Sequence, residues 1–402
     1  MVQIHLEAHR DVDGDRGDRA DDRRRIRSAQ LTSTAVHAPT RLERIRDHLA
    51  AHPEPSWSEH RTSGYLAALL TQAGLKPRPF AEFPGFTVDV GPGEPQIGLR
   101  ADLDALAHRT EAGTAVVHSC GHDANMAVVT ETVLRLAELG DRLPHGVRAI
   151  YQPAEEQGNG AAAVANLGVA DDLDLLFGVH LRPGSELPSP RFTPAISHGS
   201  CCFVRGAITG RDHHGARPHL GVNAIEVVAE FTGMVAALRV DPQIPSSAKL
   251  TSVRAGGDNL NVIPGSAAFG LDLRAQSNEA MARLREEITR IGAALELRHG
   301  VEIRLSEEDY VPAAVIGDRA ERRLSTAIRA VAGAEAVAPR SVTSGSDDFH
   351  FYTLRRPQLQ AAMLGIGADA TPGLHDPEMR YDASRLEPAV QILLAACLDG
   401  TA

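Results

Sequence analysis

The hexapeptide His118-Ser119-Cys120-Gly121-His122-Asp123 carries a residue pattern that could bind a metal ion. A thiol and an imidazole two residues apart can reach one ion if the backbone between them turns tightly, which Gly121 permits because it lacks a Cβ. The helix-favouring run 124–139 places His122 at a helix N-terminus, where the dipole favours a thiolate. On this hexapeptide alone, a buried apolar cysteine flanked by surface histidines is an equally good interpretation.

Further acidic and imidazole residues follow short apolar segments that are typical of strands. They are Asp102 and Asp104, Glu155 and Glu156, His180, and, after a Gly-rich loop, His375. Because the carboxyl ends of parallel strands meet at one edge of a sheet, we expect these side chains to converge on one crevice.

Six of the convergent side chains form a mixed sulfur, nitrogen and oxygen set suited to Zn²⁺ or a neighbouring ion such as Mn²⁺, Co²⁺ or Ni²⁺. They are Cys120, His122, Glu155, Glu156, His180 and His375. Two metals that share a bridging ligand would use five of the six, leaving one carboxylate to take a proton from the attacking water. Asp102 and Asp104 are expected to orient a ligand imidazole by accepting its second N–H. The alternative is a solvated acidic pair, satisfied core histidines and polar strand ends.

The elements that must position these residues alternate between strand and helix, which predicts an α/β fold with a doubly wound, mostly parallel sheet. The catalytic domain is predicted to span 36–198 and 312–402. The expected strands are 86–90, 97–99, 147–151, 174–179 and 359–364, and the expected helices are 41–49, 58–74, 124–139, 160–167, 318–331 and 384–397. Ser346-Asp347-Asp348 is expected to open one more helix, with the aspartates as N-cap residues.

Residues 199–311 are predicted to form an inserted α+β domain of βαββαβ order, which is ferredoxin-like. The expected strands are 202–209, 250–255, 267–274 and 302–306, and the expected helices are 221–240 and 278–297. Residues 1–35 are rich in Asp and Arg and are predicted to be a flexible charged extension.

The overall composition restricts the class of partner. The 402 residues carry a net charge of -11, which argues against nucleic acid and anionic membranes. No apolar run is long enough to span a bilayer, and residues 1–27 lack the apolar core of a signal peptide. Four cysteines do not make a disulfide framework in a chain of this length, so the expected compartment is the cytoplasm.

A family resemblance extends over roughly residues 40–400. The motifs that carry it, in order, are GLRADLDAL, HSCGHD, YQPAEE, FGVH, GARPHLGVNAI, NVIP, GSDDF and LHDP. Together they resemble the amidohydrolase branch of the dinuclear aminoacylase/carboxypeptidase metallopeptidases. That branch includes N-acyl-amino acid hydrolases, auxin–amino acid conjugate hydrolases and aminobenzoyl-glutamate hydrolases.

The resemblance implies a role for each matching residue. Cys120 would bridge two metals, His122 and His180 would bind one of them, and Glu156 and His375 the other. Glu155 would be the general base. The inserted domain would be a lid through which two chains form a homodimer, with His214 reaching the partner's site to polarise the scissile carbonyl. Asn261 and Arg274 would hold the substrate's carboxylate.

The function implied is metal-dependent hydrolysis of the amide bond in an N-acyl amino acid or related small conjugate. A dipeptidase or aminopeptidase on the same site is the first alternative, and a catalytically lapsed metal-dependent binding protein is the second. Three departures from the family pattern bear on substrate choice. Asn125 stands where many relatives have histidine, Asp347 where glutamate is frequent, and Asp212-His213 where a Gly-rich pair is usual.

Overall fold

A computed structural model describes residues 38–110 and 113–398. The extension predicted for 1–35 lies outside the described residues. The chain from Thr40 onward forms one compact unit that contains two main sheets. None of the described helices combines the length and the apolar character needed to cross a bilayer.

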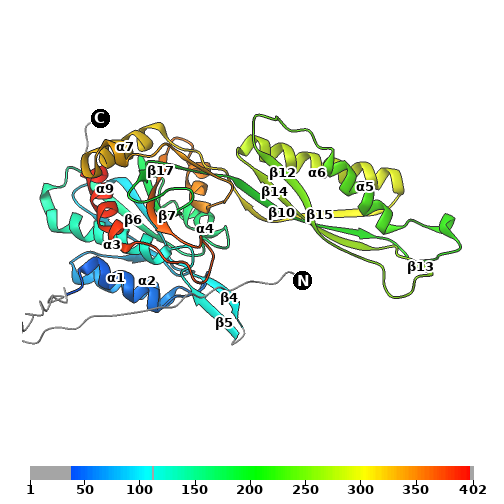
Figure 1. The fold of residues 1–402 in the computed structure, drawn as a ribbon, viewed down its shortest axis with the longest axis horizontal. Coiled ribbons are helices and arrows are strands. Elements are labelled where there is room, and N and C mark those ends of the chain that lie inside the picture. Colours follow the sequence, from blue (N-terminus) through cyan, green and yellow to red (C-terminus); the bar gives the residue numbers. More distant parts are fainter. Residues whose placement is uncertain (1–37, 111–112, 399–402) are drawn as a thin grey trace, which may run out of the picture. The chain divides into compact units, whose positions relative to one another are not determined.

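The larger sheet is mixed and mostly parallel, with the strand order β1-β2-β6-β3-β7-β17-β8. Figure 1 labels its strands β6, β7 and β17. Strands β6, β3, β7 and β17 run parallel to their neighbours in that group, whereas β1, β2 and β8 are antiparallel. The bounds are β1 Arg78–Pro79, β2 Phe86–Val90, β3 Pro95–Asp102, β6 Gly146–Gln152, β7 Leu175–Pro183, β8 Phe192–Thr193 and β17 Gln360–Ala370. The predicted α/β class is confirmed.

The sheet forks between its two central strands. β3 pairs with β7 only over Ile97–Leu99. Beyond Leu99, β3 continues to pair with β6 as far as Asp102, while β7 continues to pair with β17 as far as Pro183. The carboxyl-terminal halves of β3 and β7 are therefore no longer joined by backbone hydrogen bonds. We call the place where these two strands part the fork.

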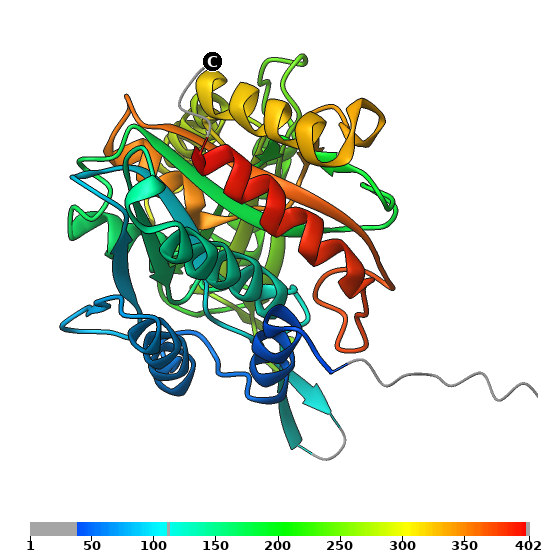
Figure 2. The ribbon, with the colours of Figure 1, turned by 90° about the vertical axis from the view of Figure 1, so that its left-hand side faces the viewer.

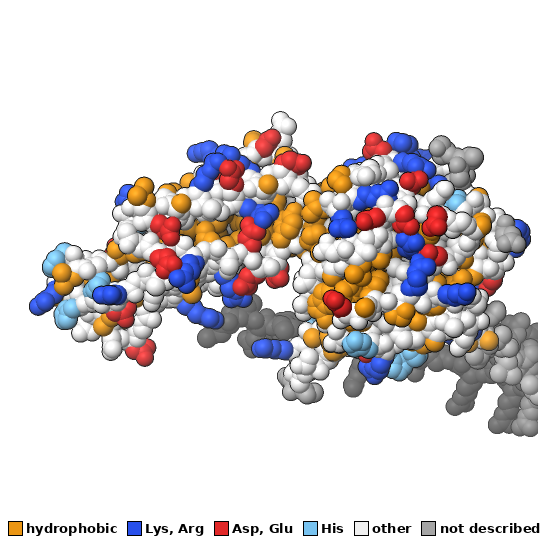
Figure 3. Space-filling view, turned by 180° about the vertical axis from the view of Figure 1, so that it is seen from behind, with side chains coloured by type: hydrophobic (Ala, Val, Ile, Leu, Met, Phe, Trp, Pro, Cys, Tyr) orange, Lys and Arg blue, Asp and Glu red, His pale blue; other side chains and the backbone are white. Residues whose placement is uncertain are grey.

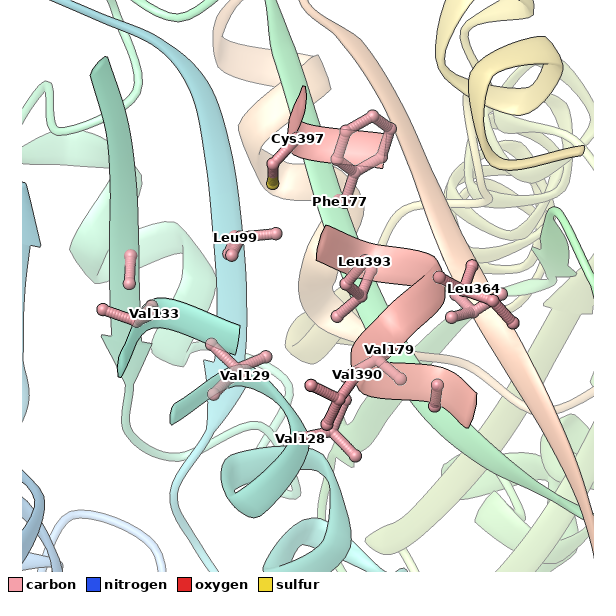
Figure 4. Packing of buried hydrophobic residues seen from close by; sticks show 14 of the residues in the cluster. Leu99, Val128, Val129, Val133, Phe177, Val179, Leu364, Val390, Leu393 and Cys397 are labelled. Atoms are coloured by element: carbon pink, nitrogen blue, oxygen red, sulfur yellow. The ribbon is translucent and has the colours of Figure 1, made fainter. Parts of the chain in front are cut away.

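Helices cover both faces of this sheet, as a doubly wound fold requires. α3, α7 and α9 pack on one face, and Figure 2 shows them side by side across it. Their apolar side chains belong to one continuous core with Leu99, Phe177 and Leu364 of the central strands. Figure 4 shows the part of this core formed by α3, α9 and the strands. α4 and α8 pack in a smaller cluster with Ile150 and Met363. The bounds are α1 Arg41–Ala51, α2 His60–Gln72, α3 His122–Leu139, α4 Gly160–Asn166, α7 Asp318–Ala332, α8 Phe351–Arg355 and α9 Leu386–Leu398.

The second sheet is four-stranded and antiparallel, with the order β12-β14-β10-β15. Along the chain its elements follow the predicted βαββαβ order, and α5 and α6 share its apolar core. We call this part of the chain the lid. The bounds are β10 Ser200–Thr209, α5 Ala224–Ala236, β12 Ser246–Ala255, β14 Ala267–Ala275, α6 Asn278–His299 and β15 Glu302–Val311. Where one domain ends and the other begins stays a prediction.

The differences from the predicted elements are mostly at element ends and in short strands. α5 is shorter than the predicted 221–240 because its N-cap is Asn223 and its C-cap is Ala237. β12, β15 and β17 are longer than predicted, since strands continue through polar residues that apolar patterning does not register. The prediction lacked the hairpin of β4 and β5 and several short strands. Besides β1 and β8, these are β4 Leu106–Thr110, β5 Gly113–Val117, β9 Ile196–His198, β16 Ser341–Thr343 and the β11–β13 pair, His213–His214 with Val262–Ile263.

Candidate metal centre

The structure brings the six predicted metal-site residues together at the fork. Two groups of potential ligand atoms each lie within 4.8 Å of one another, and both include the Cys120 thiol. One group adds His122 and His180, and the other adds Glu156 and His375. A single sulfur common to two triads has the position that a ligand bridging two ions requires.

The start of α3 positions Cys120 and His122. α3 begins at His122, and its N-cap Gly121 has φ of 83°, a left-handed conformation that glycine adopts without strain. A Cβ at this position would lie 2.6 Å from Cδ1 of Leu181 on β7. The helix can therefore approach β7 closely enough for the Cys120 sulfur to lie 3.5 Å from Nε2 of His180.

Both buried imidazoles have one ring nitrogen held by a backbone carbonyl. Nδ1 of His122 lies 2.9 Å from the Asp104 carbonyl oxygen, and Nδ1 of His180 lies 2.6 Å from that of Leu181. Each Nδ1 therefore donates its hydrogen, so Nε2 is the ring nitrogen left to bind a metal ion. The Asp104 carboxylate itself is 3.5 Å from Nδ1 of His122, so the backbone carbonyl is the group that orients this ring.

Unpartnered atoms at the centre test whether these residues fit a pair of metal ions. Among the described residues, Nε2 of His122 and Oε1 of Glu156 are buried and have no hydrogen-bond partner. Buried polar atoms normally have partners, because leaving one unsatisfied costs about 1–3 kcal/mol. Ligand-type atoms left unsatisfied next to a buried thiol, in a sulfur, nitrogen and oxygen set, fit divalent ions of the zinc type.

The turn that carries Glu155 and Glu156 is fixed by two buried carboxylates. Ala154 has a left-handed φ of 53°, and its N–H donates to Oε1 of Glu59 at 2.8 Å. The next two N–H groups, of Glu155 and Glu156, donate to the two carboxylate oxygens of Asp104 at 3.1 and 2.9 Å. Three consecutive backbone groups are thus anchored, and both glutamate side chains face the centre.

A buried arginine on β3 supports the site through its contacts with two aspartates. Arg100 is fully buried and donates to Asp102 at 2.6 Å and to Asp348 at 2.9 Å. Asp102 also accepts from the Asn125 amide at 3.0 Å, so the residue that departs from the family pattern here holds a site carboxylate. Asp347 caps the turn before α8 by accepting from the Phe349 N–H, as expected. Asp348 is not a cap residue. It accepts from Arg100, Gln152 and the Ala161 N–H instead.

Burial and neighbouring charge set the protonation of the metal-free centre. Burial, followed by the charges of Asp347 and Glu156, raises the pKa of Glu155 well above its usual range. Burial likewise raises the pKa of the Cys120 thiol, which outweighs the helix-dipole effect expected from the sequence. For His180, burial lowers the pKa to about 4, so the ring is neutral and able to act as a ligand at neutral pH.

The metal centre opens into a cavity of about 990 Å³. Cys120, Glu155, Glu156, His180 and His375 line one side of it, and Arg274 lines it from β14 of the lid. The Arg274 guanidinium pairs with Asp272 and lies 5.4 Å from the Phe203 ring centroid.

His214 and Asn261 lie elsewhere, in the lid. His214 belongs to the β11–β13 pair, and the Asn261 carbonyl accepts from the Gly215 N–H at 2.7 Å. Both side chains are exposed, and neither residue lines the cavity of the same chain. Figure 3 shows histidine side chains gathered at this end of the lid.

Glu59 and Arg100 are site residues that the sequence reasoning missed. The signal for Glu59 was present, because Glu59, Thr62, Leu66 and Leu70 follow the spacing of one buried helical stripe. Arg100 gave no such signal, since a charged residue inside a strand is normally assigned to the solvent-facing side.

Residues 98–399 match the model of peptidase family M20/M25/M40. An N-acetyl-L-cysteine deacetylase of Bacillus subtilis is 28% identical, with 87% of this chain and 85% of that protein aligned. A Rhodococcus jostii protein with a glutamate–cysteine ligase name is 32% identical over 95% of this chain. The chain spans only 48% of that longer protein, so the ligase name carries no argument here.

Among solved structures, a dinuclear metal-binding peptidase of the M20 family from Bacillus subtilis superposes with a TM-score of 0.74. It is 23% identical, and the alignment covers 89% of this chain and 97% of that one. The chain therefore belongs to peptidase family M20/M25/M40, a family of metallohydrolases that act on amide bonds. The amidohydrolase branch expected from the motifs is confirmed.

Proposed function

We propose that this protein hydrolyses the amide bond of N-acyl amino acids or related conjugates with two divalent ions, Zn²⁺ or Mn²⁺, bound at the fork. The observation that carries the proposal is the pair of ligand triads sharing Cys120, next to the buried Glu155 carboxylate. Cys120, His122 and His180 would hold one ion, and Cys120, Glu156 and His375 the other. The deacetylase relative supports an acylated amino acid as the substrate class.

The bound ions supply Lewis acidity, which lowers the pKa of a water molecule and polarises the scissile carbonyl. The chain's own residues carry the proton transfers. Glu155 removes a proton from the attacking water, and the resulting hydroxide adds to the carbonyl carbon. Glu155 then returns the proton to the amine nitrogen as the C–N bond breaks. The anchored N–H groups of residues 154–156 hold Glu155 in place throughout, at no reorganisation cost.

The lid completes the proposed site across a homodimer. His214 of one chain would stabilise the oxyanion in the partner's site, and Asn261 with Arg274 would bind the carboxylate of the amino acid. The exposed position of His214 and Asn261, outside the cavity of their own chain, supports action across an interface.

Substitution of the general base tests the proposal. Glu155→Gln keeps the size and hydrogen-bonding capacity of the side chain but cannot accept the proton, so kcat is expected to fall about 10²- to 10⁴-fold. Metal content, measured by elemental analysis, should match the wild type. Glu138→Gln, at an exposed carboxylate on α3, is the control and should retain full activity. Near-normal turnover by Glu155→Gln would contradict the base assignment.

A substrate panel tests the reaction class. Protein reconstituted with Zn²⁺ or Mn²⁺ should cleave N-acetyl amino acids, and a chelator should abolish the cleavage. If unblocked dipeptides are cleaved and their N-acetylated forms are not, the protein is a dipeptidase. If no substrate is cleaved, the lapsed binding protein is the correct interpretation.

A further inference from the structure

A buried arginine two residues beyond His180 has no part in the proposed chemistry. His180 and Arg182 both belong to β7, and alternate residues of a strand face the same side of a sheet. Both line the cavity, so the Arg182 side chain lies next to the metal centre. Arg182 is only 4% exposed, although an arginine is almost never buried unless it is paired.

The hydrogen bonds of Arg182 are incomplete. Among the described residues, its guanidinium bonds only to Glu186, four residues further along. Its Nε is buried with no partner at all. Since a guanidinium carries five N–H donors, most of its capacity is unused, and an unsatisfied buried donor is costly. An anionic group in the cavity would satisfy these donors.

His198 adds a second unsatisfied polar group to the same wall. It is the last residue of β9, is 3% exposed and lines the cavity, and its Nδ1 is buried without a partner. Burial lowers its pKa to about 3, although the Asp347 charge opposes this, so the ring is neutral at neutral pH. Arg182 and His198 both line this one cavity, and each carries a buried nitrogen without a partner.

The cavity therefore has two guanidinium groups, on different sheets. Arg274 of the lid is the one that the family resemblance assigns to the substrate's α-carboxylate. Arg182 is separate from it in the fold, on a strand of the larger sheet. The acidic residues Glu186, Asp309 and Asp347 also line the cavity, and of these only Glu186 bonds to Arg182. A ligand with one carboxylate satisfies only one of the two guanidinium groups.

We propose that Arg182 and His198 form a subsite for a second carboxylate of the substrate, and that the protein prefers dianionic N-acyl amino acids to monoanionic ones. This inference rests on the proposed function, because it specifies the substrate class of that site. The second carboxylate is carried either by a dicarboxylic acyl group or by an acidic amino acid side chain. Both place the same anion on the same donors, and matched substrates separate them.

The kinetic test uses pairs of substrates that differ in one charge. N-succinyl-leucine is compared with N-succinamoyl-leucine, and N-acetyl-glutamate with N-acetyl-glutamine. In one pair the acid should exceed its amide by about 10- to 100-fold in kcat/KM, the range expected for a charge-assisted bidentate contact. The pair that shows the preference identifies the half of the substrate that reaches Arg182.

Variants of Arg182 test the cause of the preference. Arg182→Met should reduce the ratio of acid to amide to near unity, and Arg182→Lys should restore part of it as a point charge. Arg355→Met is the matched control, because Arg355 pairs with Asp171 and does not line the cavity. This control should keep the wild-type ratio. If Arg182→Met slowed acid and amide equally, the residue would be structural and the inference would be overturned.

Binding to metal-free protein separates this inference from the proposed function. Calorimetry should show the favoured acid binding about 10-fold or more tightly than its amide, with the difference lost in Arg182→Met. Equal affinities would overturn the subsite even if the metal-loaded protein cleaves N-acyl amino acids. A preserved binding preference in a protein that cleaves none of them would uphold the subsite and overturn the proposed function.

Discussion

The fork between β3 and β7 and the β11–β13 end of the lid both carry residues proposed to act on substrate, yet their surroundings differ sharply. At the fork, His122 is fully buried and Glu155 is 8% exposed, and their backbone or ring groups are anchored by neighbouring carbonyls and carboxylates. In the lid, the His214 side chain is exposed, and its hydrogen bond in the described structure is a local one from the Ala216 N–H. The fork is preorganised by its own chain, whereas His214 is held by few contacts of its own chain and would act, under the proposed function, in the site of a partner chain.

The largest expected effect is at the fork. Cys120→Ser replaces the shared sulfur by a hydroxyl that binds zinc-type ions weakly, so metal content should fall together with activity, by about 10³-fold or more in kcat/KM. Elemental analysis and kinetics on the same preparation measure both. Cys202→Ser, in the lid core, is the control and should keep its metal. If the Cys120→Ser variant stayed active and metal-loaded, the bridging role of Cys120 would be refuted, and the fork would no longer be the region on which metal binding depends.

The next effect should come from the lid. His214→Ala is expected to lower kcat about 10²- to 10³-fold, as loss of an oxyanion donor does, with no loss of metal or stability because the side chain is exposed. Thermal unfolding and metal analysis would check that the variant keeps the stability and the metal content of the wild type.

Mixing experiments then decide whether His214 acts across an interface. If it does, combining inactive His214→Ala and Glu155→Gln chains should restore activity, because a mixed dimer contains one intact site. A mixture that remains inactive would place the action of His214 within its own chain and contradict the proposed division between the two regions.

The smallest expected effect concerns Glu59, behind the general base. Burial raises its pKa to about 7, above the usual 4.5, so between these values the folded protein holds a proton that the unfolded chain has lost. Stability of the metal-free protein should therefore fall as pH rises through this window. Glu59→Gln keeps an acceptor for the Ala154 N–H and removes this dependence, worth on the order of 1–3 kcal/mol. Urea unfolding at pH 5 and pH 8 measures it.

Glu54 provides a control of opposite sign in the same segment. Hydrogen bonds from Thr62 and Arg61 outweigh its burial and lower its pKa. Its contribution to stability is present above the usual pKa and is lost as pH falls, so Glu54→Gln should destabilise most at neutral pH. If stability of both variants depended on pH in the same way, the raised pKa of Glu59 would be contradicted.

The sequence could predict the fold and the set of residues that meet at the fork. Strand and helix alternate clearly, Glu155 comes shortly after the apolar strand β6, and His180 lies in the carboxyl-terminal half of β7, so the topology brings them to one edge of the sheet. Cys120 was found from its spacing to His122 at an expected helix N-terminus, and His375 from its place after a Gly-rich loop that follows a strand. The roles of all these residues remain predictions.

What the sequence could not predict are contacts that depend on backbone geometry. Asp104 was expected to hold an imidazole with its carboxylate, but that carboxylate accepts two N–H groups of the turn at Glu155, and its carbonyl holds His122. Nothing in a residue pattern distinguishes a carbonyl from a carboxylate of the same residue. The fork itself depends on where two strands stop pairing, which hydrophobic alternation does not record.

The fork also determines what must be copied to transfer the metal site to another protein scaffold. Its six potential ligands come from the turn before α3 and the first residue of α3, from β7, from the turn after β6 and from the loop after β17, and they meet where β3 and β7 part after three paired residues. On an unbroken parallel sheet, backbone hydrogen bonds would join the two strands along their whole length, and the separation between their carboxyl-terminal halves would be lost. A graft of this chemistry into another scaffold must therefore transfer the divergence of the strands together with Arg100, and the choice of ligands comes second.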